Sequence, residues 1–347
     1  MPKTNENTES NHSIRPNSKL SRIRLTLIAT TIFCGLVVSG VSGYSQAQAI
    51  TNEAATDHSG WIRIPGALVR SDCVHEVPTG AMVEMSDDNE ITGNVTLNGE
   101  VIAHYEPCSE KPVITGTRKR SAASANASGT GNGPVEDSQW DLPLAANDNI
   151  DYLGNTWTVP AYPSTGGALI YLYNAIAPES GDWILQPVLQ YGESGVGGGN
   201  YYTISSWLIG ANGYAFYSPL VEVNPGDTIL GHTGLNEVSG STFYFMTEAK
   251  DETTGRYSWI KTHISHEHWT WAFAGVLEVY GLSTCSQLPS SNELTFRNAV
   301  VDHGFPYYNN IKGDGWVGAI YSYGGPSCGF MVHASQNSTL LWSTVIF

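Results

Sequence analysis

The feature that most restricts the fold is a series of short β-prone segments that fills the chain from residue 139 to residue 347. Segments rich in Val, Ile, Tyr, Trp and Phe are broken by Gly, Pro, Asn or Asp about every 8–12 residues, and helical periodicity does not persist. This pattern predicts an all-β fold, an antiparallel β-sandwich or jelly roll. The expected strands are 167–173, 183–191, 200–209, 214–221, 227–231, 241–248, 256–264, 269–280, 292–298 and 339–346.

The first 49 residues have the composition of an export signal. Basic residues at positions 19, 22 and 24 precede an apolar run over 25–41, and the triplet Ala47-Gln48-Ala49 follows it. A signal peptidase recognises these features, so we predict a signal peptide over 1–49, cleavage after Ala49 and a secreted, extracellular protein. The alternative is an uncleaved anchor, because the apolar run approaches membrane-spanning length.

Cysteine usage fits an exported protein. Removing the signal removes Cys34 and leaves Cys73, Cys108, Cys285 and Cys328. An even number of cysteines suggests two disulfides, and three pairings are possible. Two cysteines precede residue 110 and two follow residue 280, which favours the pairs 73–108 and 285–328.

Charge restricts the partners of the mature protein. From residue 131 onward the chain has 19 Asp and Glu against five Lys and Arg. Nucleic acid and anionic membranes are therefore poor partners after signal cleavage, and such a surface is compatible with work in acid. We expect a monomer that acts on protein or peptide substrates without a cofactor.

The chain before the sandwich divides into two parts. Residues 50–116 contain strand-like runs at 94–97 and 101–105 around the turn Asn98-Gly99, and indicate a small β module. Residues 117–138 begin with a basic cluster that ends at Arg120 and continue as a small-residue linker. The module is either a propeptide removed by cleavage near Arg120 or a domain on a simple tether. The sandwich domain follows over 139–347.

Two strands carry polar side chains on one face. In the segment 183–192, the period of two places Gln186 and Gln190 together with Val188, opposite Leu189 and Tyr191. In the segment 269–280, Glu278 shares a face with Val276 and Tyr280. From the pattern alone, these polar residues are expected on a solvent-exposed face. The alternative is a groove or site that holds the carboxylate.

Six short motifs add a more specific indication. In chain order they are Leu189-Gln190-Tyr191-Gly192, Tyr201-Tyr202-Thr203-Ile204-Ser205-Ser206-Trp207, Val223-Asn224-Pro225-Gly226-Asp227-Thr228-Ile229, Thr253-Thr254-Gly255, Ala274-Gly275-Val276-Leu277-Glu278 and Phe296-Arg297-Asn298-Ala299. Their order over roughly 155–300 resembles the eqolisins, the scytalidoglutamic peptidase-like family of glutamic peptidases. The resemblance implies a concanavalin-like sandwich and a secreted endopeptidase that works in acid.

The resemblance also implies a catalytic pair, Gln190 and Glu278. The glutamate would take a proton from the attacking water and return it to the departing amine, while the glutamine amide donates to the oxyanion. We assign substrate contacts to Gln186, Tyr191, Trp207 and Tyr280.

Other chemistries have weaker support in the sequence. The histidines at 263, 266 and 268 lack the HExxH spacing of zinc peptidases, so we expect no metal. Neither a GxSxG elbow nor Asp-Thr/Ser-Gly occurs, and the mature cysteines are assigned to disulfides. A lectin-like sandwich that binds glycans remains an alternative, as does a glycoside hydrolase that uses Glu278 with a second carboxylate.

Overall fold

A computed structural model of the chain describes residues 60–114, 135–141, 150–178, 183–265, 269–303, 309–310, 317–320, 326, 328–333, 335 and 337–344. The predicted signal peptide, residues 1–49, and the basic start of the predicted linker lie outside these residues.

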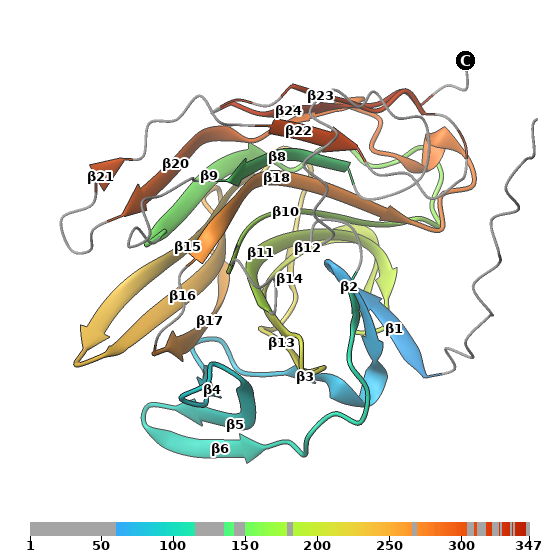
Figure 1. Cartoon of the computed structure of the whole chain (residues 1–347). Coiled ribbons are helices and arrows are strands. Elements are labelled where there is room, and N and C mark those ends of the chain that lie inside the picture. The colour runs from blue at the N-terminus through green and yellow to red at the C-terminus, as the bar shows by residue number, and fades with distance from the viewer. Residues whose placement is uncertain are drawn as a thin grey trace, which may run out of the picture. The chain divides into compact units, whose positions relative to one another are not determined.

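Two large sheets make up most of the fold (Figure 1). Sheet I has the spatial order β22 (Val317–Ile320), β8 (Val135–Asp141), β18 (Trp269–Tyr280), β10 (Leu169–Pro178), β11 (Trp183–Ser194), β12 (Gly197–Gly210), β13 (Ala215–Tyr217) and β3 (Val74–Glu76), with β14 (Val221–Val223) paired to β12. Sheet II has the order β21 (Asn309–Asn310), β20 (Arg297–His303), β9 (Tyr152–Thr158), β15 (Thr228–Ser239), β16 (Thr242–Asp251), β17 (Tyr257–Ile264), β4 (Met82–Met85), β5 (Ile91–Leu97) and β6 (Glu100–His104).

Two small sheets complete the described structure. One contains β1 (Trp61–Ile64), β2 (Ala67–Arg70) and β7 (Val113–Ile114), and the other contains β19 (Glu293–Thr295), β24 (Thr339–Leu341) and β23 (Met331–His333). The helical elements of the described residues are the short 3-10 turns η1 (Ser71–Cys73) and η3 (Cys285–Gln287). The predicted all-β sandwich is confirmed. No helix in the described ranges is long and apolar enough to cross a membrane.

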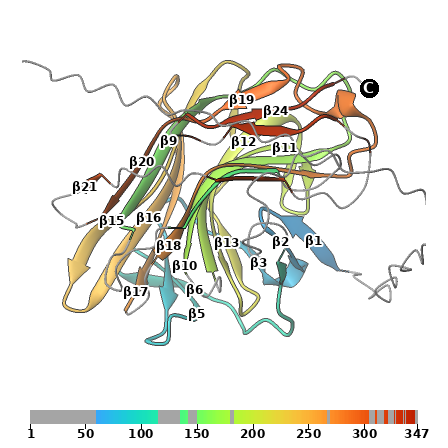
Figure 2. The ribbon, with the colours of Figure 1, turned by 45° about the horizontal axis from the view of Figure 1, so that its top comes forward.

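The strands follow the alternation predicted from the sequence. On β11, Leu189 and Tyr191 point toward sheet II and join a cluster with Trp157 of β9 and Ile229 of β15. We call this side of sheet I the core face. Val188 points the other way and packs with residues of β1 and β2, so we call that side the hairpin face. In Figures 1 and 2 the β1–β2 hairpin lies beside β11, β12 and β13.

The N-terminal module is built into the sandwich. Its strand β3 extends sheet I by parallel pairing with β13, and its strand β4 extends sheet II by parallel pairing with β17. Val83 and Val95 of the module share one apolar cluster with Phe245 and Ile260 of the sandwich. Residues 57–347 accordingly form one compact unit.

Local predictions for the module and the disulfides hold. Asn98 and Gly99 have φ of 54° and 83° and form the tight turn between β5 and β6. Both predicted disulfides, Cys73–Cys108 and Cys285–Cys328, are present, with Cα separations of 5.7 and 5.5 Å. Two disulfides are compatible with an extracellular protein. Strand β8 begins at Val135, within the range 117–138 predicted as linker.

Candidate functional site

The register of sheet I brings Gln190 and Glu278 to the same face. Both residues pair with Tyr171, Gln190 from β11 and Glu278 from β18, because β10 runs between these two strands. Residues paired directly across strands point to the same side of a sheet, and two strand spacings separate the two backbones by about 10 Å. The side chains lie on the hairpin face.

Glu278 is buried, contrary to the exposure expected from the strand pattern, and its solvent exposure is 0%. Its Oε1 accepts a hydrogen bond from the Tyr173 hydroxyl at 2.8 Å. Its Oε2 accepts from the backbone N–H of Gly66 at 2.7 Å and from the Tyr280 hydroxyl at 3.3 Å. A buried carboxylate needs such donors, because each oxygen has lost its hydration.

Gln186 lies two pleats before Gln190 on β11 and is also fully buried, at 0% exposure. Its Nε2 donates to the carbonyl oxygen of Pro65 at 2.9 Å. Its Oε1 is buried and has no hydrogen-bond partner among the described residues. The carbonyl of Pro65 and the N–H of Gly66 belong to one peptide group, so Gln186 and Glu278 hold the two polar ends of the same peptide bond.

Gln190 makes contacts of a different kind. Its Nε2 donates to the carbonyl oxygens of Gly192 and Gly197, at 2.9 and 2.8 Å, and its Oε1 accepts from the Ser194 hydroxyl at 3.3 Å. A Cβ placed at Gly198 would collide with the Gln190 amide nitrogen. Gln190 is 1% exposed and braces the glycine-rich turn between β11 and β12.

The other predicted substrate contacts divide between the two faces. Tyr280 lies on the hairpin face, where the Arg63 guanidinium stands 4.6 Å from the centre of its ring. Trp207 is on the same face, stacks on Tyr217 with ring centroids 4.7 Å apart, and donates to the Ser205 hydroxyl. Tyr191 is on the core face, 5.1 Å from the ring of Tyr202. Trp207 and Tyr280 thus share the face of the pair, and Tyr280 contacts Glu278 directly, whereas Tyr191 lies on the opposite face.

Two tyrosines complete the polar lining of the hairpin face, and the sequence did not single them out. Tyr173 bonds Glu278, and the Tyr171 hydroxyl donates to the backbone carbonyl of Arg63 at 3.1 Å. Burial raises the pKa of Tyr171, and the negative charge of Glu278 raises it further, so the hydroxyl remains a donor over the whole working range of pH. Both tyrosines belong to β10, where Tyr171 pairs with Glu278 and Tyr173 with Val276. Residues paired across strands share a face, so the tyrosines lie on the hairpin face.

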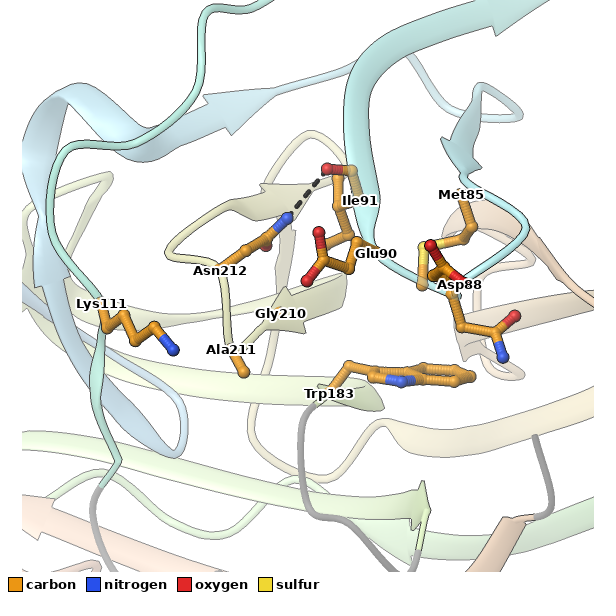
Figure 3. A pocket seen from close by; sticks show the side chains of 10 residues that line it. Met85, Asp88, Glu90, Ile91, Lys111, Trp183, Gly210, Ala211 and Asn212 are labelled. Atoms are coloured by element: carbon orange, nitrogen blue, oxygen red, sulfur yellow. Dashed lines mark hydrogen bonds between the residues drawn. The ribbon is translucent and has the colours of Figure 1, made fainter. Parts of the chain in front are cut away.

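A separate pocket of 330 Å³ lies between the module and the sandwich (Figure 3). It is lined by Met85, Asp88, Asn89, Glu90, Ile91, Lys111, Trp183, Gly210, Ala211 and Asn212. None of the predicted site residues belongs to this lining. The lining comes from the β4–β5 turn, the segment between β6 and β7 that holds Lys111, the end of β12 with the turn after it, and the start of β11.

Metal ligation has no geometric support in the described part of the chain, which contains no group of three or more His, Cys, Asp or Glu side chains able to hold a metal ion. His263 is described, and burial lowers its pKa. The other two members of the histidine motif, His266 and His268, lie outside the described residues.

Comparison with known proteins gives matches at the level of structure. No family model matches the sequence, and no curated protein matches it. A crystal structure of scytalido-glutamic peptidase with a transition-state analogue inhibitor is 14% identical over 61% of this chain and 98% of its own, with a TM-score of 0.41. SCP-B, a member of the eqolisin family in complex with the tripeptide Ala-Ile-His, is 14% identical over 62% of this chain and 100% of its own, with a TM-score of 0.40. Both matched structures are of glutamic peptidases, the family named in the sequence analysis.

Proposed function

We propose that the chain is a peptidase of the glutamic class, in which Glu278 activates the attacking water and Gln186 stabilises the oxyanion. The observation that carries the proposal is the Pro65–Gly66 peptide group. A buried carboxylate accepts its N–H, and a buried carboxamide donates to its carbonyl oxygen. A site that binds both ends of a peptide group in this way has the donors and acceptors that amide hydrolysis requires.

The chemistry follows from the charges that develop during hydrolysis. With a substrate peptide in the groove, Glu278 takes a proton from a water molecule as the water attacks the carbonyl carbon, and then returns the proton to the departing amine nitrogen. The carbonyl oxygen becomes an oxyanion, and the Gln186 amide, already directed at a carbonyl oxygen, donates to it. Tyr173 and Tyr280 fix the two carboxylate oxygens of Glu278.

The glutamine in this proposal differs from the one that the motif suggested. The Leu-Gln-Tyr-Gly motif nominated Gln190, whose amide donates to backbone carbonyls of its own hairpin. Gln186 instead donates to a peptide from another part of the chain, 121 residues away in sequence. We assign Gln190 to the support of the site and Gln186 to the chemistry. The wider function we infer is a secreted endopeptidase that acts on proteins or peptides in acid.

The test compares two matched substitutions on one strand and one face. In purified protein of residues 50–347, assayed with casein and a quenched fluorescent peptide between pH 2 and 7, Gln186→Ala should lower kcat on the order of 10²–10³-fold, the effect of losing an oxyanion donor. Gln190→Ala should lower the melting temperature, and its effect on kcat should be smaller than that of Gln186→Ala. Activity should survive EDTA.

Two results would overturn parts of this proposal. If Gln190→Ala abolishes turnover while Gln186→Ala retains it, the motif assignment replaces ours. If EDTA abolishes turnover, the reaction depends on a metal and the glutamic mechanism is wrong.

A further inference from the structure

The β1–β2 hairpin covers the site that we assign to catalysis. We propose that this hairpin is a built-in inhibitor, which occupies the substrate groove and leaves it by displacement, while the rest of the module stays as a permanent part of the enzyme. This inference rests on the proposed function, because it concerns the regulation of the same site.

The hairpin is held by contacts along its length and not only at its tip. At the tip, the Pro65–Gly66 peptide lies between Gln186 and Glu278. Further back, the carbonyl of Arg63 accepts from the Tyr171 hydroxyl, and the Arg63 guanidinium lies over the Tyr280 ring. The hairpin contributes backbone groups and a side-chain cation, which a peptide substrate also offers, so it binds as a peptide ligand would.

Burial shows that the fit is close. Ile64, Ala67 and Val69 are 0–1% exposed and pack on the hairpin face of sheet I. At the open end of β1, Ile62 packs so closely on the β11–β12 turn that a Cβ at Gly195 would collide with it. A peptide from solution has no room on this face while the hairpin is in place.

The geometry also explains why the Pro65–Gly66 bond is stable in the closed state. Hydrolysis requires a water molecule between the carboxylate and the carbonyl carbon. Here Oε2 of Glu278 bonds the amide nitrogen of Gly66 directly, and the carboxylate is 0% exposed. The attacking water is displaced, so the bound peptide group inhibits without being cut.

The pairing of strands separates the hairpin from the rest of the module. Strands β3 and β4 belong to the hydrogen-bonded ladders of sheets I and II, and module residues share a core cluster with the sandwich. Strands β1 and β2 belong to a small sheet of their own with β7. The hairpin can therefore leave without breaking either large ladder, whereas removal of the module would break both. Cleavage near Arg120 should leave the module bound.

The experiment removes the contact at the hairpin tip. Gly66 has φ of +78°, a value that proline cannot adopt, and its N–H is the donor to Glu278, so Gly66→Pro removes the donor and distorts the turn. Loss of a hydrogen bond to a charged group predicts a rise in peptidase activity on the order of tenfold to a hundredfold. The matched control is Gly99→Pro, the same change in the β5–β6 turn of the same module. There φ is +83°, and no heavy atom lies within 4 Å of a Cβ placed at this position. It should leave activity at the wild-type level.

A second readout does not depend on catalysis. A fluorescent synthetic peptide of residues 61–70 should bind Gly66→Pro and inhibit it, and should not bind wild type. If Gly66→Pro fails to fold, as judged by circular dichroism, Arg63→Ala provides the same two readouts, since it removes the contact of the guanidinium with the Tyr280 ring and leaves the hairpin backbone unchanged.

The outcomes separate the two proposals. Equal activity of wild type and a folded hairpin variant, or equal peptide binding by both, would overturn the inhibitor. Suppose that only the variant binds the peptide and that neither protein hydrolyses a substrate at any pH. The hairpin would then still be the occupant of the groove, but the proposed peptidase function would be wrong. If wild-type protein cut in the linker loses the module on gel filtration, the permanent module is wrong.

Discussion

The two faces of sheet I are both buried, but they are buried by different partners. The core face packs Ile170, Leu172 and Leu277 against sheet II, and its buried Asn174 and Ser206 donate hydrogen bonds directly to groups of sheet II. The hairpin face carries Tyr173, Gln186 and Glu278 among its apolar residues, and the β1–β2 hairpin packs on it.

The difference lies in what satisfies the buried polar side chains: on the core face they bond sheet II, whereas Gln186 and Glu278 on the hairpin face bond the Pro65–Gly66 peptide group. Apolar side chains are satisfied by any close-packed apolar partner, whereas a buried carboxylate and carboxamide cost free energy unless specific donors and acceptors reach them. On the hairpin face, the Pro65–Gly66 peptide group donates to Glu278 and accepts from Gln186. This requirement for a peptide group is the basis on which we propose that the face binds peptide substrates after the hairpin moves. The following substitutions test this contrast.

The largest effect is expected from Glu278→Gln. The amide keeps the volume of the side chain but cannot act as a base, so kcat should fall on the order of 10²–10⁴-fold, while circular dichroism stays unchanged. The measurement uses the Gly66→Pro background, in which the groove is open. Glu222→Gln, which alters an exposed carboxylate on β14, is the control and should retain activity. Wild-type turnover in Glu278→Gln would contradict the mechanism.

A smaller effect is expected from Tyr173→Phe, which removes one of the donors that hold Glu278. A misplaced base slows the chemical step, so kcat should fall about tenfold while KM changes little. The matched substitution on the core face is Tyr202→Phe, whose hydroxyl makes a contact of 3.4 Å with the Ala161 carbonyl. If both substitutions change kcat equally, the two faces do not differ in the way proposed.

The smallest effect concerns pH at the junction between module and sandwich. His75 of β3 stacks on Tyr105 at 3.8 Å, and burial lowers its pKa, an effect that the nearby Asp72 charge partly offsets. Its Nε2 is buried and without a hydrogen-bond partner in the described ranges. A histidine with a lowered folded pKa contributes its full stability above pH about 6.5, and that stability is lost as pH falls toward the folded pKa.

Replacing this histidine should therefore weaken the acid sensitivity. His75→Phe should lessen the fall in melting temperature between pH 7 and 4 on the order of 2–4 °C, measured by scanning calorimetry. His104→Phe, at an exposed position on β6, serves as the control. An unchanged pH dependence in His75→Phe would exclude this residue as a source of acid sensitivity.

The sequence by itself determined most of the local structure. Period-two alternation in β11 and β18 correctly divided Leu189 from Gln190 and placed Glu278 with Val276, because neighbouring residues of a strand must point to opposite sides. The Asn98-Gly99 turn and the disulfide pairing followed from backbone preference and from cysteine position. The all-β fold followed from the same short-range patterns.

Only the tertiary structure decided which polar residues lie together. The strand pattern predicted exposure for Glu278, yet its partner Gly66 lies 212 residues away, and Pro65 lies 121 residues from Gln186. The Pro65-Gly66 dipeptide is readable locally as a turn, but a turn signal does not tell where its peptide group will dock. Docking depends on the shape and the unsatisfied polar groups of a distant sheet. Such contacts leave no periodic trace in the sequence, so only the folded chain shows that Gln186 and Glu278 bond the same peptide group.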